Sequence, residues 1–132
     1  MLLATRYAMP LDVAESRVRL GTKSFGRLGI VRAGRPHIVP VNYLSTGDGL
    51  YVHDVDGDQL HDTLPGEIVV LGVDDSNDQR AWSVMVKGVA ERMTDRDLSH
   101  ARSLPTWIWT PETPGAFVRI RAVEITGRLY QR

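Results

Sequence analysis

Cysteine is absent from the 132-residue sequence, which excludes disulfide bonds, cysteine-ligated zinc sites and thiol nucleophiles. Long apolar stretches are also missing, because the longest, at 68–73, is far shorter than a membrane span. Residues 1–6 lack the basic start and apolar centre of a secretory signal. At this length we expect one domain, residues 1–132, that is cytoplasmic and has no membrane partner.

An excess of basic residues is lacking as well, since 16 Lys and Arg balance 16 Asp and Glu. Proteins that bind nucleic acid generally carry such an excess, so we expect no nucleic-acid partner. The balance is uneven along the chain, because residues 47–79 hold nine acids and no Lys or Arg. Aspartate favours turns and the ends of loops, which accounts for most of these acids.

Short β-rich runs separated by tight turns dominate the chain. The candidate strands are 27–32, 36–44, 50–53, 67–73, 81–90 and 117–121, and the candidate helices are 10–20, 59–64 and 95–103. The run 81–90 alternates, which places Trp82 on one face and Ser83 on the other. Residues 123–127 are expected to turn toward the end of the chain. Helical crossovers are missing between most strands, so the pattern predicts an antiparallel sheet that curls into a small barrel.

An ordered series of short motifs runs along this pattern. The motifs are Gly26-Arg27-Leu28-Gly29, Gly34-Arg35-Pro36, Val39-Pro40-Val41-Asn42-Tyr43, Trp82-Ser83-Val84-Met85-Val86-Lys87-Gly88, Phe117-Val118-Arg119-Ile120 and Ile125-Thr126-Gly127. The series resembles the pyridoxamine 5'-phosphate oxidase-like flavin-binding split barrels, above all their short actinobacterial and nitroimidazole-reductase-like branch. It covers residues 10 to about 128. The resemblance implies a mainly β (α+β) fold, an antiparallel split β-barrel with two or three short peripheral helices.

The resemblance also implies a function. Members of this family form homodimers that hold FMN or a deazaflavin in grooves at the subunit interface. We therefore expect an oxidoreductase that transfers hydride to or from a small molecule, with the cofactor carrying the chemistry and the protein supplying binding and electrostatics. The alternative is a non-catalytic small-molecule-binding or structural dimer that kept the barrel and lost FMN.

The resemblance assigns the flavin ring to the strand around residues 40–43 and the phosphate end to residues 53–60. The candidate cofactor-binding residues are Pro40, Val41, Asn42, Tyr43, His53, Asp54, Gln59, Trp82, Ser83 and Trp109. The residues at 40–43 are equally compatible with an ordinary strand, and Trp82 with the core or an interface. Trp109 lies in a proline-rich loop that either covers a pocket or is pinned to its own barrel. No catalytic side chain is assigned.

The phosphate end departs from the family pattern. Gln59 stands where relatives commonly have lysine, and Asp54 and Asp58 stand where small hydroxyl residues are usual. A phosphate carries roughly −1.5 to −2 charge near neutral pH. A carboxylate at ~6 Å in an effective dielectric of about 20 repels each unit of that charge by about 3 kcal/mol. Arginines from elsewhere, such as Arg27, Arg80 or one of the partner chain, are then needed to compensate.

Other motifs point to no alternative chemistry. A calcium loop starting at Asp54 requires glycine at its sixth position and glutamate at its twelfth, but glycine is at the fourth and Pro65 at the twelfth. The pairs His53-Asp54 and His61-Asp62 lack further ligands, so we expect no metal site there. A looser cation site formed by the aspartates at 54, 56 and 58 is the remaining option. There is no Walker loop, dinucleotide fingerprint or G-x-S-x-G motif.

Overall fold

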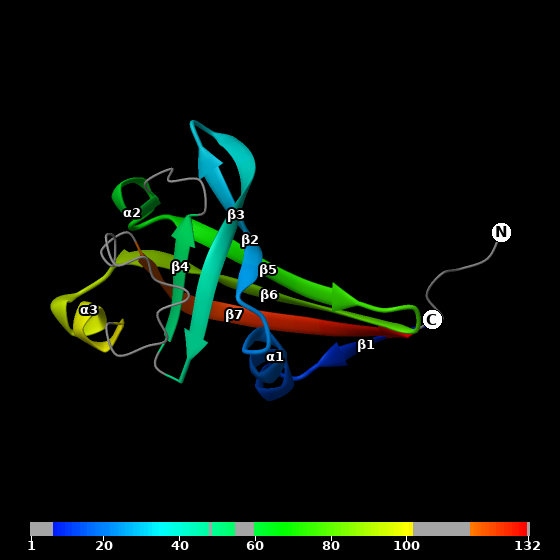
Figure 1. Cartoon of the computed structure of the whole chain (residues 1–132). Coiled ribbons are helices and arrows are strands. Elements are labelled where there is room, and N and C mark those ends of the chain that lie inside the picture. Colours follow the sequence, from blue (N-terminus) through cyan, green and yellow to red (C-terminus); the bar gives the residue numbers. More distant parts are fainter. Residues whose placement is uncertain (1–6, 48, 55–59, 102–116, 132) are drawn as a thin grey trace.

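The computed structural model describes residues 7–47, 49–54, 60–101 and 117–131. These residues form seven strands and three short helices (Figure 1). The strands are β1 (Tyr7–Leu11), β2 (Phe25–Arg32), β3 (Arg35–Thr46), β4 (Gly49–Asp54), β5 (Ile68–Ser76), β6 (Arg80–Arg92) and β7 (Val118–Gln131), and the helices are α1 (Val13–Leu20), α2 (Leu60–Thr63) and α3 (Asp95–Ala101). No described helix is both long and apolar enough to cross a membrane.

All strands pair antiparallel in one sheet, in the order β1-β7-β4-β3-β2-β5-β6, and β6 also pairs with β7. This last pairing closes the sheet into a barrel. One edge of β7 is divided between β4, at Val118–Ile120, and β1, at 127–131. The far ends of β5, β6 and β7 therefore extend beyond the barrel as an arm, with β1 along β7 (Figure 1). The predicted fold, a mainly antiparallel split barrel with short helices, is confirmed.

The core follows from the alternation of side chains along the strands. On β3, Val41 and Tyr43 are 0% exposed, and the residues between and beside them lie on the opposite face. Helix α1 covers one end of the barrel, where Leu20 is buried. The hydroxyl of Tyr43 donates a hydrogen bond of 2.5 Å to the carbonyl of Leu20, which ties β3 to this helix. Burial raises the pKa of the Tyr43 phenol well above its ordinary value.

Local signals at turns and caps account for several boundaries. The predicted turn between the first two candidate strands is confirmed: Ala33 and Gly34 have φ of 52° and 76°, as a two-residue hairpin turn requires. Helix α3 is capped by Thr94, whose hydroxyl accepts a hydrogen bond from the amide of Asp97. The side-chain carboxylate of Asp97 in turn accepts a hydrogen bond of 2.8 Å from the amide of Thr94.

Two predictions at the chain ends are wrong. Residues 7–11 form strand β1, so α1 begins only at Val13, with the carboxylate of Asp12 accepting a hydrogen bond from the Glu15 amide at 2.8 Å. Residues 123–127 do not turn but lie within β7, which β6 pairs along its length. Gly127 is required there by close packing, because a Cβ at this position would overlap the Ser16 hydroxyl of α1.

Candidate functional site

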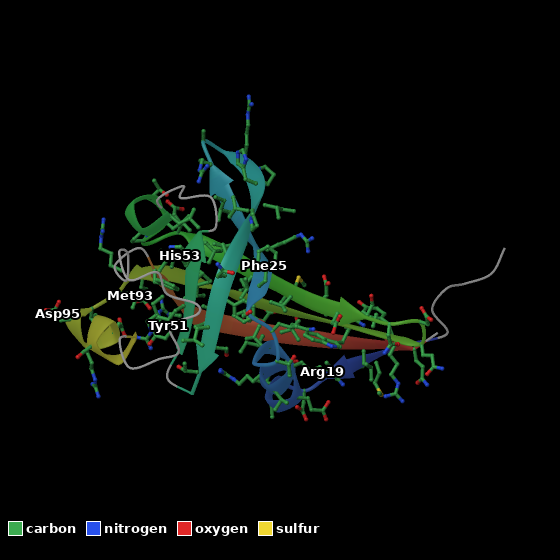
Figure 2. All side chains as sticks on the ribbon, viewed as in Figure 1. Arg19, Phe25, Tyr51, His53, Met93 and Asp95 are labelled. Carbon is green, nitrogen blue, oxygen red and sulfur yellow. The ribbon has the colours of Figure 1, made fainter. Side chains whose placement is uncertain are left out.

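The outer face of the sheet, which points away from the core, carries a row of three candidate side chains. Asn42 on β3 lies directly opposite Phe25 on β2 and His53 on β4. Residues directly opposite on antiparallel strands point to the same side of the sheet, so these three form one row across three strands. Phe25 is 52% exposed, and Asn42 and His53 are half-buried. We call Phe25, Asn42 and His53 the outer row; Figure 2 labels the side chains of Phe25 and His53.

The outer row ends against a small apolar cluster. The imidazole of His53 stacks on the ring of Phe117, with centroids 4.7 Å apart and planes inclined by 28°. Phe117 and Tyr51 are each 1% exposed, and Leu44 and Met93 pack against them. The cluster lies on the outer side of β3 and β4, beside the start of α3 (Figure 2). Its packing fixes the orientation of the His53 ring at the end of the row.

Two cations, Arg27 and Lys87, lie on the same face as the outer row, and Arg27 is next to it. Arg27 follows Phe25 by two residues on β2 and is opposite Pro40 on one side and Gly72 on the other. Lys87 on β6 lies one row further along. Both side chains are exposed, and neither forms an ion pair with another residue in the described ranges. Guanidinium and ammonium groups in such a position are suited to phosphate and other anions.

Large apolar side chains are exposed around these cations. They are Phe25, Val31, Ile38, Ile68 and Met85, each more than half exposed and all on β2, β3, β5 or β6. Gly29 and Gly72 also lie on this side, so no side chain projects from the sheet at these two positions in the middle of the face. We call the face formed by β2, β3, β5 and β6 on this side the outer sheet face. A contiguous apolar area of this kind marks an interaction surface.

The other predicted cofactor-binding residues are divided between the two sides of the sheet. The side chains of Val41 and Tyr43 point into the core, so only their backbone is available at the strand. Trp82 packs against the core, and the Arg19 guanidinium lies 5.8 Å from its ring centroid. Ser83 lies on the opposite face of β6, as the alternation predicted.

Pro40 and Asn42 lie together on the outer side of β3, where Pro40 borders Arg27. Asp54 ends β4 opposite Val41. The proposed positions of Gln59 and Trp109, and the loop at 55–59 that carries the looser cation site, lie outside the described residues. Among the described residues no three His, Asp or Glu side chains are grouped as a metal site requires.

Phe25 and Phe117 were not among the predicted site residues. Phe25 is two residues before Arg27, so the alternation of a strand extended by two residues predicts the shared face. Phe117 meets His53 only through the pairing of β4 with β7, and no signal within either segment indicates that contact.

Comparison with known proteins identifies the family. The family model for pyridoxamine 5'-phosphate oxidase matches residues 12–129, nearly the whole described fold. The chain belongs to the pyridoxamine 5'-phosphate oxidase family. The resemblance drawn from the motif series is thereby confirmed. Among curated proteins, none matches the chain.

Solved structures of pyridoxamine 5'-phosphate oxidase-like proteins share the fold. A candidate pyridoxamine 5'-phosphate oxidase of Corynebacterium glutamicum is 30% identical, with a TM-score of 0.80, over 96% of this chain and 100% of that one. The FAD-binding protein of Mycobacterium smegmatis is 25% identical, with a TM-score of 0.77, over 94% and 99%. A candidate 5-nitroimidazole antibiotic resistance protein of Bacteroides thetaiotaomicron, 16% identical with a TM-score of 0.70 over 96% and 90%, shares the fold alone.

Proposed function

We propose that this pyridoxamine 5'-phosphate oxidase family member binds a flavin nucleotide on the outer sheet face and acts as an oxidoreductase of small molecules. The observation that carries the proposal is the outer row, in which Phe25, Asn42 and His53 lie side by side with Arg27 next to them. This is a flat, partly apolar strip with polar groups at defined points and a cation beside it. The FAD-binding protein of Mycobacterium smegmatis, similar over 94% of this chain, supports the same choice of ligand.

Each residue of the strip has a role that its chemistry permits. The Asn42 amide carries both donors and acceptors, which suits the polar edge of the ring system. Phe25 offers apolar contact to its face, and His53, held by the Phe117 stack, offers a ring nitrogen. Arg27 and Lys87 attract the phosphates. Bound flavin supplies hydride transfer; the side chains of this chain bind it, orient it and exclude water.

We propose FAD in preference to FMN. The segment 47–79 offers nine acids and no Lys or Arg to pair with a terminal phosphate monoester. The monoester of FMN approaches two negative charges at neutral pH, whereas each phosphate of the FAD pyrophosphate carries one. Carboxylates near the phosphate end therefore disfavour FMN, and the similarity to the FAD-binding protein of Mycobacterium smegmatis favours FAD.

We propose that a second copy of the chain covers the outer sheet face, so that the protein works as a homodimer. A single copy leaves Ile38 72% and Ile68 66% exposed on that face. Burial of such side chains against a symmetry-related copy removes apolar area from water and completes the walls of the flavin site. We place this activity in the cytoplasm. The chain has no cysteine, so it forms no disulfide bond that would require an oxidising compartment.

Equilibrium titration tests the proposal. FAD, FMN and a deazaflavin are titrated into the purified protein, and quenching of flavin fluorescence reports binding, with FAD expected to bind most tightly. His53→Ala and Asn42→Ala are expected to weaken FAD binding about tenfold each, as for the loss of one polar contact. His37→Ala is the matched control, because His37 is an exposed histidine on β3, the strand of Asn42, and lies outside the outer row.

The outcomes separate the two functions that the sequence allows. A colourless protein that binds none of the three at micromolar concentration overturns the oxidoreductase and leaves the non-catalytic dimer, which the lysine-free acidic segment favours. Equal losses of affinity in His37→Ala and His53→Ala overturn the placement of the site on the outer row.

A further inference from the structure

A cavity opens where strand β4 separates from β7. The two strands pair only as far as Leu50 and Ile120, after which β7 continues alongside β6. The end of the β3–β4 hairpin and helix α1 close the space that remains, so that Ser45, Leu20 and Val86 line a cavity of about 200 Å³. This volume is smaller than the about 300–1,000 Å³ typical of drug-sized pockets, so a small ligand suits it.

The cavity exists because of a bulge in β7. The register between β6 and β7 shifts between Lys87 and Gly88, which changes which residues of β7 face inward. Ile120 and Ile125 both line the cavity although they are five residues apart, an interval that a regular alternation does not allow. Between them stands Ala122, whose methyl group is too small to fill the gap.

The rim of the cavity is basic. It is lined by Arg17 of α1 and by Arg119 and Arg121 of β7, and the floor is apolar. Among the described residues, two carboxylates lie near these guanidinium groups: Asp97 is 3.8 Å from Arg119, and Glu91 is 3.4 Å from Arg121. Arg17 forms no ion pair with another residue in the described ranges, so its guanidinium group is available to an anion.

The adjoining helix terminus does not oppose an anion there. The carbonyl of Leu20 accepts a hydrogen bond from the Tyr43 hydroxyl, and the carbonyl of Arg17 accepts one from the Gly21 amide. The Arg19 carbonyl likewise accepts a hydrogen bond from the Thr22 amide, so three of the last four carbonyl groups of α1 are hydrogen-bonded within the protein.

We propose that this cavity is a binding site for a small amphiphilic monoanion, a carboxylate with a short aliphatic chain. The chain lies against the apolar floor, and the carboxylate meets the guanidinium groups, which pair with it through planar N–H donors. The site is distinct from the flavin strip: Leu50 and His53 are three residues apart on β4, which places them about 10 Å apart along the strand. Binding here does not depend on the proposed flavin function.

Methyl spectra of the protein with labelled isoleucine and valine test this proposal, with sodium hexanoate as the probe. Hexanoate is expected to shift the methyl signals of Ile120, Ile125 and Val86, and to leave those of Ile38 and Ile68 on the outer sheet face unmoved. Acetate, which lacks the chain, and hexylammonium, which lacks the anion, are expected to cause no saturable shift. Equal binding of either overturns the amphiphilic character of the site.

Two variants locate the binding. Ala122→Phe fills the cavity and is expected to abolish the hexanoate shifts, whereas Val123→Phe, at a neighbouring residue that is 65% exposed and outside the lining, leaves them intact. The double variant Arg17→Ala with Arg121→Ala changes exposed side chains only and is expected to weaken binding about tenfold. It keeps the test decisive should Ala122→Phe fail to fold.

Three results contradict the proposal: hexanoate binding at wild-type affinity in the double arginine variant, the same binding in a folded Ala122→Phe protein, or displacement of hexanoate by FAD. The last result identifies the cavity with the flavin site, and so separates failure of this proposal from failure of the proposed function.

Discussion

The contact between Gly127 and helix α1 gives the sharpest test of the fold. A Cβ built at Gly127 overlaps the Oγ of Ser16 and lies 3.2 Å from the Cβ of Leu11. Ser16 is 0% exposed, so its side chain has no space into which to move. Gly127→Ala therefore forces α1 away from β7, and excess packing of this kind costs about 1–3 kcal/mol of the free energy of unfolding.

Ser16→Ala provides the partner variant in a double-mutant cycle. The Ser16 hydroxyl is buried and has no hydrogen-bond partner among the described residues, so its removal is expected to leave stability unchanged or raise it by up to about 1 kcal/mol. In the Gly127→Ala background it also removes the overlapping atom. Beyond its own effect in the wild type, we expect it to recover about half of the loss, which is a coupling free energy of about 0.5–1.5 kcal/mol.

Urea unfolding followed by tryptophan fluorescence measures the free energy of unfolding of all four proteins. One fixed protein concentration is used, because the proposed dimerisation makes stability depend on concentration. Additive effects of the two substitutions, or a Gly127→Ala protein as stable as the wild type, refute the packing of α1 on β7. The matched control is Gly47→Ala, since a Cβ at Gly47 has no heavy atom within 4 Å.

Three further predictions concern single contacts. Tyr43→Phe removes the buried hydrogen bond to the Leu20 carbonyl and is expected to lower the free energy of unfolding by about 1–2 kcal/mol, with no change in the urea unfolding contradicting that bond. The ammonium group of Lys23, 2.8 Å from the Asp75 carboxylate, donates a hydrogen bond that lowers the pKa of that carboxyl. The small contribution of this ion pair to the stability of the fold is therefore present at neutral pH and is lost as the pH falls through the lowered pKa. Lys23→Gln is expected to return the Asp75 pKa toward its usual value in an NMR titration, and an unaltered titration contradicts the ion pair. Phe25→Asp places a charge on the outer sheet face and is expected to convert the proposed dimer to monomer in size-exclusion chromatography with light scattering. A Phe25→Asp protein that remains dimeric contradicts the placement of the interface on this face.

Local patterns predicted much of the fold because they act within a few residues. The alternation of 81–90 placed Trp82 and Ser83 on opposite faces of β6, as the structure has them. The Ala33-Gly34 turn follows from its glycine. Strand β1 was missed because Pro10 and the short length argue against a strand, and only pairing with the distant end of β7 makes one.

Gly127 shows that a glycine in the sequence can have two structural interpretations, a turn or a close packing contact. In the sequence it indicates a turn, because glycine permits unusual backbone angles. In the fold it provides room for Ser16 in the middle of β7. The two cases differ only in a contact between residues more than a hundred positions apart, which no local pattern contains.

Only part of the candidate site could be predicted, because its residues meet through contacts between distant parts of the sequence. The resemblance named Asn42 and His53, but their position side by side depends on the register of β3 and β4. Phe25 joins the row through the register of β2 and β3, and Phe117 meets His53 through a third contact. The arginine-rimmed cavity depends on a bulge and on the separation of two strands, so no local pattern indicates it.

Sedimentation velocity of the protein with a substoichiometric amount of FAD, recorded at the visible absorption band of flavin, tests the central claim most directly. We expect the flavin to sediment with the protein, as a species of twice the 14.7 kDa chain mass. Flavin that stays unsedimented while the protein moves as a single chain contradicts it.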